Sequence, residues 1–274
     1  MKNKKINFCL LAVLMFPLAC FAADKTVSPK QKPFNSDYFE VGTVEKKDYS
    51  DMDVESILAD AKDFYFDLKL EDAEEAADNV LDFDPKNVVA VALKNKISKI
   101  REKYVLFLRE LTDSYLIELN SCAKLGNFYE GFMYYHKIEQ LVPEAVDKFA
   151  YIKLSEQRDK IADKIDNINS KQKFLDSVNY FRDGQYTKAS KIVNSLSKKD
   201  SKFNNYAAMV SIYTLKERSA KRAASNYKQA LKCVKSEKFN EALDYVQMAY
   251  GLVQDDVKIK ILMEQINLEI ELDN

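Results

Sequence analysis

The pattern of apolar and polar positions is helical from about Met52 to the end of the sequence, because apolar residues recur at steps of three and four. Within that stretch one short pattern occurs four times. A small residue has an aromatic residue or leucine three places before it and apolar residues four and seven places after it. The small residues are Ala73, Gly131, Ala189 and Ala242. Their spacings of 58, 58 and 53 residues indicate one helical unit that is built four times and stacked.

Each unit is predicted to be a pair of antiparallel helices joined by a tight turn. In the last three units the turns are predicted at residues 125–127, 183–185 and 236–238. Pro85 and Pro143 are predicted to close the first two units, because proline cannot continue a helix. Only five glycines and five prolines occur in 274 residues, which favours long helices over a sandwich or barrel. The predicted fold class is therefore all-α.

The order of small, aromatic and proline positions resembles the tetratricopeptide repeat, a helical hairpin of about 34 residues. In the first unit the resemblance rests on Ala61, Phe64, Leu70, Ala73, Ala77, Val80 and Pro85, and in the second on Gly126, Phe128, Gly131, Tyr135, Ile138 and Pro143. In the third it rests on Gly184, Tyr186, Ala189, Val193 and Leu196, and in the fourth on Ala230, Phe239, Ala242, Val246 and Ala249. It implies a TPR-like α-solenoid of stacked antiparallel hairpins over residues 52–274.

The period is longer than that of the family, and about 20 extra residues per unit fall at 86–108, 144–165 and 199–220. These segments lack Gly and Pro and carry apolar residues at helical spacing. Each unit is therefore expected to contain either an additional helix or a first helix of nearly 40 residues, which would be about 60 Å long.

The first 22 residues have the layout of a secretory signal peptide, with a basic start, an apolar run too short to span a bilayer, and small residues up to Ala22. A second interpretation is a lipobox, in which Cys20 would be lipidated and become the first mature residue. Residues 23–51 are polar and are predicted to be a flexible linker. The chain is thus expected to be exported to the periplasm, or to be anchored on the periplasmic side or at the cell surface if Cys20 is lipidated.

The charge balance limits the class of partner. The 42 basic and 43 acidic residues give a net charge of −1, and removal of the three lysines of the signal peptide takes it to −4. Nucleic acid is not expected as a partner, because its binding depends on neutralising phosphates. A membrane contact is expected only through a lipid on Cys20.

Few residues carry candidate chemistry. The one histidine, His136, lies beside tyrosines and has no His or Cys cluster around it, so neither a metal site nor a catalytic role is expected. The acidic residues between Glu71 and Asp78 are interpreted as a solvated helix face. Cys122 and Cys233 occupy the same place in their units and are interpreted as small packing residues. No cofactor and no enzymatic activity is expected.

In the tetratricopeptide family the first helix of each hairpin forms the inner surface, so the resemblance implies a groove for a peptide there. The corresponding residues are Lys62, Tyr65, Asn120, Lys124, Phe174, Phe181, Arg182, Tyr227 and Lys235. The alternative is that extra helices cover this face and these residues only pack.

The predicted function is an exported, non-enzymatic adaptor or scaffold that holds a protein partner in the bacterial envelope. One alternative is a self-associating structural spacer, or an assembly lipoprotein anchored through Cys20. Another is an enzyme or a binding protein for cell-wall or sugar ligands, with a polar pocket around His136. The oligomeric state is left open.

Overall fold

The computed structural model describes Tyr49 and residues 53–273, apart from the side chains of 272 and 273, and this part contains ten α-helices, two short 3-10 helices and no strand. The all-α prediction is confirmed. The chain divides into two compact units, Met1–Asn35 and Ser36–Asn274, and every described residue belongs to the second. The predicted signal peptide, with Cys20, lies outside the described residues, as does the linker up to Tyr49.

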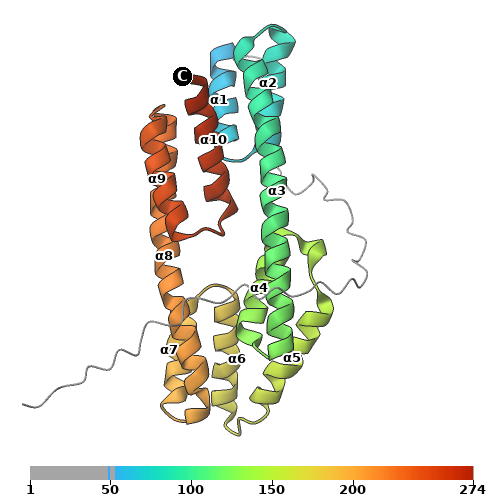
Figure 1. Ribbon diagram of the computed structural model, residues 1–274, viewed down its shortest axis with the longest axis vertical. Helices are drawn as coiled ribbons and strands as arrows, with labels where there is room; N and C mark the ends of the chain where they lie inside the picture. Colours follow the sequence, from blue (N-terminus) through green and yellow to red (C-terminus); the bar gives the residue numbers. More distant parts are fainter. Residues whose placement is uncertain (1–48, 50–52, 274) are drawn as a thin grey trace, which may run out of the picture. The chain divides into compact units, whose positions relative to one another are not determined.

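Four pairs of consecutive helices form hairpins (Figure 1). They are α1 (Val54–Phe66) with α2 (Leu70–Phe83), α3 (Val88–Leu125) with α4 (Phe128–Leu141), α6 (Ile168–Arg182) with α7 (Tyr186–Ser197), and α8 (Asn204–Lys235) with α9 (Phe239–Leu252). Each hairpin packs on the next through its second helix, since α2 contacts α3, α4 contacts α6 and α7 contacts α8. Two further helices, α5 (Lys148–Ala162) and α10 (Val257–Asp273), lie outside the hairpins.

The four hairpin turns share one backbone feature. Each has a residue with a left-handed φ five places before the small residue of its unit: Leu68 (61°), Gly126 (80°), Gly184 (71°) and Glu237 (55°). This conformation is easy for glycine and costs other residues about 1–2 kcal/mol. The equal placement shows that the four turns are built alike, although only two of them have the residue that suits them.

The extra residues of the units take two forms. The segment 86–108 contains the first half of α3, which has 38 residues. The segment 199–220 contains the first half of α8, which has 32 residues. At 1.5 Å per residue these helices are about 57 and 48 Å long. The segment 144–165 instead contributes most of η2 (Pro143–Ala145) and the separate helix α5. Both expected forms therefore occur, in different units.

The small residues of the repeated pattern are buried, and Ala73, Ala189 and Ala242 are 0% exposed. At Gly131 the close neighbour is a side chain of the inserted helix α5. A β-carbon built on Gly131 would lie 2.5 Å from Cδ2 and 2.7 Å from Cδ1 of Leu154, which belongs to α5. The small residue of the second unit thus makes room for the inserted helix, which is a neighbour that the hairpin interpretation did not include.

The two prolines lie where the second helices end. Pro85 is in the exposed turn between α2 and α3, and Pro143 opens η2 directly after α4. Tyr49, which falls within the predicted linker 23–51, has a side chain that is 8% exposed. Burial, followed by the nearby Asp60, Glu75 and Asp72, raises the pKa of its hydroxyl.

The C-terminal helix α10 connects the last hairpin to the first units. It packs on α9 and on α3, and Gln265 Nε2 donates a hydrogen bond to the backbone oxygen of Tyr65 in α1 at 2.5 Å. Ile261, Leu262 and Ile266 of α10 are 0% exposed. In Figure 1, α10 accordingly runs beside α1, α3 and α9, so it joins the last hairpin to the first two.

Candidate interaction surface

Two of the predicted groove residues hold the turn between α8 and α9 beside α1. Lys62 Nζ lies 3.7 Å from Glu237 Oε1, and Lys235 Nζ lies 3.4 Å from Asp63 Oδ2. All four side chains are more than half exposed. Exposed pairs of this kind contribute about 0–1 kcal/mol each. They orient the first and last hairpins without fixing them strongly.

Three aromatic residues that were predicted to line the groove lie in the core. Tyr65, Phe174 and Phe181 are each 0% exposed. Phe174 and Phe181 meet Tyr129 of α4 edge to face, with ring centroids 6.2 and 5.4 Å away. These rings fill the space between neighbouring helices and have no surface for a partner, so the groove prediction does not hold for them.

Arg182 and Tyr227 are partly buried. Arg182 Nε donates to Asp183 Oδ1 at 2.7 Å, which holds the guanidinium against its own turn. Burial raises the pKa of Tyr227 to about 12, and the carboxylates of Asp256 and Asp67 act in the same direction. Both side chains are therefore only partly accessible to a partner.

The remaining two predicted residues, Asn120 and Lys124, are exposed and belong to a longer surface on α3. This surface, called here the α3 line, consists of Leu106, Asp113, Ile117, Asn120 and Lys124. Steps of seven, four, three and four residues place them on one side of the helix, over about 27 Å. Leu106 is 50% and Ile117 is 70% exposed.

The α3 line lies opposite the buried side of the helix, where Tyr115 and Leu119 pack. Its two large apolar side chains are separated by polar ones. A rigid surface with spaced apolar anchors is the kind on which a partner helix or peptide docks. It contains Asn120 and Lys124 of the predicted inner surface, together with exposed residues that were not predicted.

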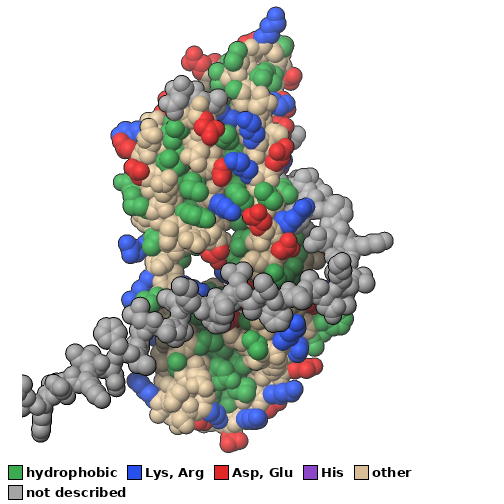
Figure 2. Space-filling view, viewed as in Figure 1, with side chains coloured by type: hydrophobic (Ala, Val, Ile, Leu, Met, Phe, Trp, Pro, Cys, Tyr) green, Lys and Arg blue, Asp and Glu red, His purple; other side chains and the backbone are tan. Residues whose placement is uncertain are grey.

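The first half of α3 faces α10 instead. Lys96 Nζ lies 2.6 Å from Glu269 Oε2, and Lys103 pairs with Glu264. In Figure 2, basic and acidic side chains alternate over this region, where α10 lies beside α3. The helix that covers the inner surface of the first two units is thus the C-terminal one, which the sequence interpretation did not single out.

A polar network ties the loop between α9 and α10 to α3 and α4. Asp255 Oδ2 accepts hydrogen bonds from Lys137 Nζ and from the Tyr115 hydroxyl, both at 2.8 Å. The ammonium of Lys137 also lies 4.8 Å from the centroid of the Tyr115 ring. Burial alone would raise the pKa of Asp255, but Lys137 and the two hydrogen bonds outweigh it and lower the pKa.

Further tyrosines lie near this network. Tyr186 and Tyr213 have ring centroids 5.2 Å apart, the Tyr186 hydroxyl donates to Met133 Sδ at 3.0 Å, and the Tyr213 hydroxyl donates to Glu130. Burial, followed by nearby carboxylates, raises the pKa of Tyr134 and of Tyr186 to about 12. The hydroxyls of Tyr186 and Tyr213 are hydrogen-bond donors that join α7 and α8 to α4.

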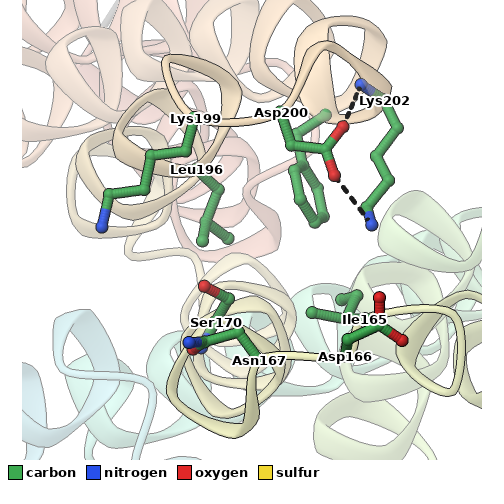
Figure 3. Close-up of a pocket in the computed structure, with 9 residues that line it drawn as sticks. Ile165, Asp166, Asn167, Ser170, Leu196, Lys199, Asp200 and Lys202 are labelled. Carbon is green, nitrogen blue, oxygen red and sulfur yellow. Dashed lines mark hydrogen bonds and ion pairs between the residues drawn. The ribbon is translucent and has the colours of Figure 1, made fainter.

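A hollow of about 200 Å³ lies between the loop before α6 and the loop after α7 (Figure 3). Its walls include Ile165, Asn167, Leu196, Asp200 and Lys202. Asp200 and Lys202 pair at 2.8 Å, and Lys202 Nζ also donates to the backbone oxygen of Lys164 at 3.2 Å. Two of the charged side chains at this hollow, Asp200 and Lys202, are therefore engaged with each other and with the backbone, and the hollow is not the basis of a proposal.

The residues with candidate chemistry have ordinary partners. His136 Nε2 lies 2.9 Å from Gln140 Nε2, and Nδ1 lies 3.4 Å from Glu139. Cys122 is buried and Cys233 is half-buried, and neither forms a disulfide. Within the described residues no three His, Cys, Asp or Glu side chains come together as metal ligands.

The acidic residues of α2 pair with basic residues of α3. Arg101 Nη2 lies 2.7 Å from Glu74 and 3.9 Å from Glu71, and Lys94 Nζ lies 2.5 Å from Asp78. These contacts agree with their interpretation as a solvated helix face.

No family model, curated protein or solved structure matches this chain. Among the described residues, no helix combines the length and the apolar character that crossing a membrane requires. The proposed function therefore rests on the surface of the described residues.

Proposed function

We propose that this chain is a non-enzymatic adaptor of the bacterial envelope that holds a protein partner on tetratricopeptide-like helical repeats. The main observation behind this proposal is that the four hairpins are built alike. Each has a left-handed turn residue five places before a buried small residue, and each packs on the next through its second helix. Repeated hairpins that pack in sequence form rigid, extended surfaces, and such surfaces usually bind proteins.

The α3 line is the proposed contact surface. It carries the exposed apolar side chains of Leu106 and Ile117 and the exposed polar side chains of Asn120 and Lys124 on one rigid helix. Because the helix is already folded, its ordering costs no free energy when a partner binds. A partner helix with apolar side chains about 16 Å apart would match the two anchors, which are 11 residues apart.

Export, with cleavage after Ala22 or lipidation of Cys20, is part of the proposal. It rests on the layout of the first 22 residues. Metabolic labelling with a radioactive fatty acid distinguishes the two forms, since only a chain lipidated at Cys20 takes up label and a Cys20→Ala variant does not.

The experiment that tests the adaptor role is capture of partners from the envelope fraction of the source cell. A double variant of the α3 line, Ile117→Glu with Lys124→Glu, should lose the captured protein. The matched control, Ile168→Glu with Lys148→Glu, makes the same two changes at exposed positions elsewhere and should retain it. Equal capture by both variants would refute the α3 line as the contact surface.

A further inference from the structure

The near-neutral net charge of the chain conceals two oppositely charged segments. Residues 53–84, which contain α1 and α2, have twelve acidic and two basic residues. Residues 186–238, which contain α7 and α8, have thirteen basic and three acidic residues. The segments therefore carry net charges of −10 and +10, in a chain whose total is −1.

On α2 the acidic residues form a straight line. Glu71, Glu75, Asp78 and Asp82 are all exposed, and their steps of four, three and four residues keep them on one side of the helix. The opposite side is buried against the core. Cations of α3 lie beside two of them, yet the Glu71 and Asp78 side chains remain 48% and 51% exposed.

On α8 three lysines and one serine form a line with the same spacing. Lys221, Ser225, Lys228 and Lys232 are exposed, and Arg218 and Arg222 lie beside this line and are exposed as well. Lys221 pairs with Glu217 of its own helix at 2.9 Å. No acidic side chain in the described part of the chain pairs with Arg218, Arg222, Lys228 or Lys232. In Figure 2, basic side chains stand along the edge where α7 and α8 lie.

The two lines match in length. In each line the first and last residues are 11 positions apart, which is about 16 Å. If α2 and α8 lie antiparallel, Glu71, Glu75 and Asp82 face Lys232, Lys228 and Lys221, and Asp78 faces Ser225.

Both lines are exposed, although Glu71 and Asp78 of the acidic line also lie beside cations of α3. α2 packs on α1 and α3, and α8 packs on α7 and α9. We infer that the acidic line of α2 in one copy of this chain docks on the basic line of α8 in a second copy, as an antiparallel helix pair. Such a contact joins unlike surfaces, so one contact leaves the α8 line of one copy and the α2 line of the other available, and further copies can add head to tail. This inference does not depend on partner binding by the α3 line.

The test is the mass of the full chain in solution, measured by sedimentation velocity at two salt concentrations. The chain should form a concentration-dependent series of oligomers at about 0.01 M salt and sediment as a monomer at about 1 M, because the screening length falls from about 30 to about 3 Å. A chain that is monomeric at both concentrations of salt overturns the inference.

Charge reversal identifies the two surfaces. The variant Lys221→Glu, Lys228→Glu, Lys232→Glu and the variant Glu71→Lys, Glu75→Lys, Asp82→Lys should each lower the apparent association constant at least tenfold. An equimolar mixture of the two should associate again, because the unaltered acidic line of the first variant can pair with the unaltered basic line of the second, and the two reversed lines are also opposite in charge. The control Lys148→Glu, Lys153→Glu, Lys160→Glu makes the same charge change on exposed positions of α5 and should associate like the unaltered chain.

Circular dichroism of each variant establishes that its helices are intact. A folded pair of variants that fails to associate when mixed contradicts the helix pairing. Binding of the unaltered chain to vesicles of anionic phospholipid, without any self-association, would overturn the inference too, because it would assign the basic line to a membrane surface.

Discussion

Leu154 of α5 occupies the space that a β-carbon on Gly131 of α4 would need, with its two terminal carbons 2.5 and 2.7 Å from that position. Leu154 is itself 0% exposed, so its side chain has little room to move. The helix that is inserted between the second and third hairpins is therefore seated on the small residue of the repeated pattern.

The first prediction concerns this contact. Gly131→Ala should destabilise the fold by up to about 2 kcal/mol, since overpacking costs about 1–3 kcal/mol and alanine regains about 1 kcal/mol of helix propensity. In a Leu154→Ala background the same change should become stabilising by about 1 kcal/mol. Urea unfolding of the four proteins of this cycle measures both values, and additive effects would contradict the contact.

The second prediction concerns the turn residue Glu237, which has a φ of 55°. Glu237→Gly should raise the free energy of unfolding by about 0.5–1 kcal/mol, because relief of the left-handed strain exceeds the entropy that glycine loses on folding. Thermal unfolding measures the change as a rise of a few degrees. Gly184→Ala, at the equivalent turn, is the matched reverse change and should lower the midpoint.

The third prediction concerns pH. The pKa of Asp255 is lower in the folded chain than its ordinary value, so its carboxylate stabilises the fold above about pH 4, and this contribution is lost as the pH falls through the folded pKa. Asp255→Asn should cost about 1 kcal/mol at pH 7, a modest value because the side chain is 45% exposed.

Denaturant unfolding of Asp255→Asn at pH 7 and at pH 3 tests the direction of this pH dependence. The difference from the unaltered chain should shrink at the lower pH. The control Asp82→Asn removes a carboxylate that is exposed and should change stability little at either pH. A constant difference at both pH values would contradict the account of the network.

The fourth prediction concerns the cysteines. Burial, followed by Glu130 and Glu118, raises the pKa of Cys122 to about 12, so little reactive thiolate forms at neutral pH. In the native chain a thiol reagent should modify Cys233 much faster than Cys122, and urea should equalise the rates. Peptide mass spectrometry at successive times measures both, and equal rates without urea would show that Cys122 is accessible.

The sequence was sufficient to predict that the chain is helical and where three of the hairpin turns lie, because the positions of small and apolar residues in each unit depend on local packing. It left α5 as one of two alternatives and did not single out α10. The sequence did not reveal which side of the first helices stays accessible to a partner. Tyr65, Phe174 and Phe181 have the spacing of an inner surface, but that spacing is the same for a ring that lines a groove and for one that fills a core. Their burial depends on α10 and α4, which approach from elsewhere in the chain.

The polar network around Asp255 shows the same limit. Tyr115 and Lys137 are 22 residues apart, and Asp255 lies 118 residues beyond Lys137, so nothing local marks them as partners. The sequence did contain a signal for the α3 line, because Leu106 and Ile117 are apolar residues on the polar side of a helix. The charge segregation between α2 and α8 was also present in the sequence, but it is lost when charge is counted over the whole chain.

The most direct test of the adaptor role is quantitative capture from the envelope fraction with three forms of the chain: the unaltered protein, Ile117→Glu with Lys124→Glu, and the control Ile168→Glu with Lys148→Glu. The account predicts that one protein or a small set is recovered by the unaltered chain and the control and is lost from the α3-line variant. Recovery of the same proteins by all three forms, or of none by the unaltered chain, would contradict it.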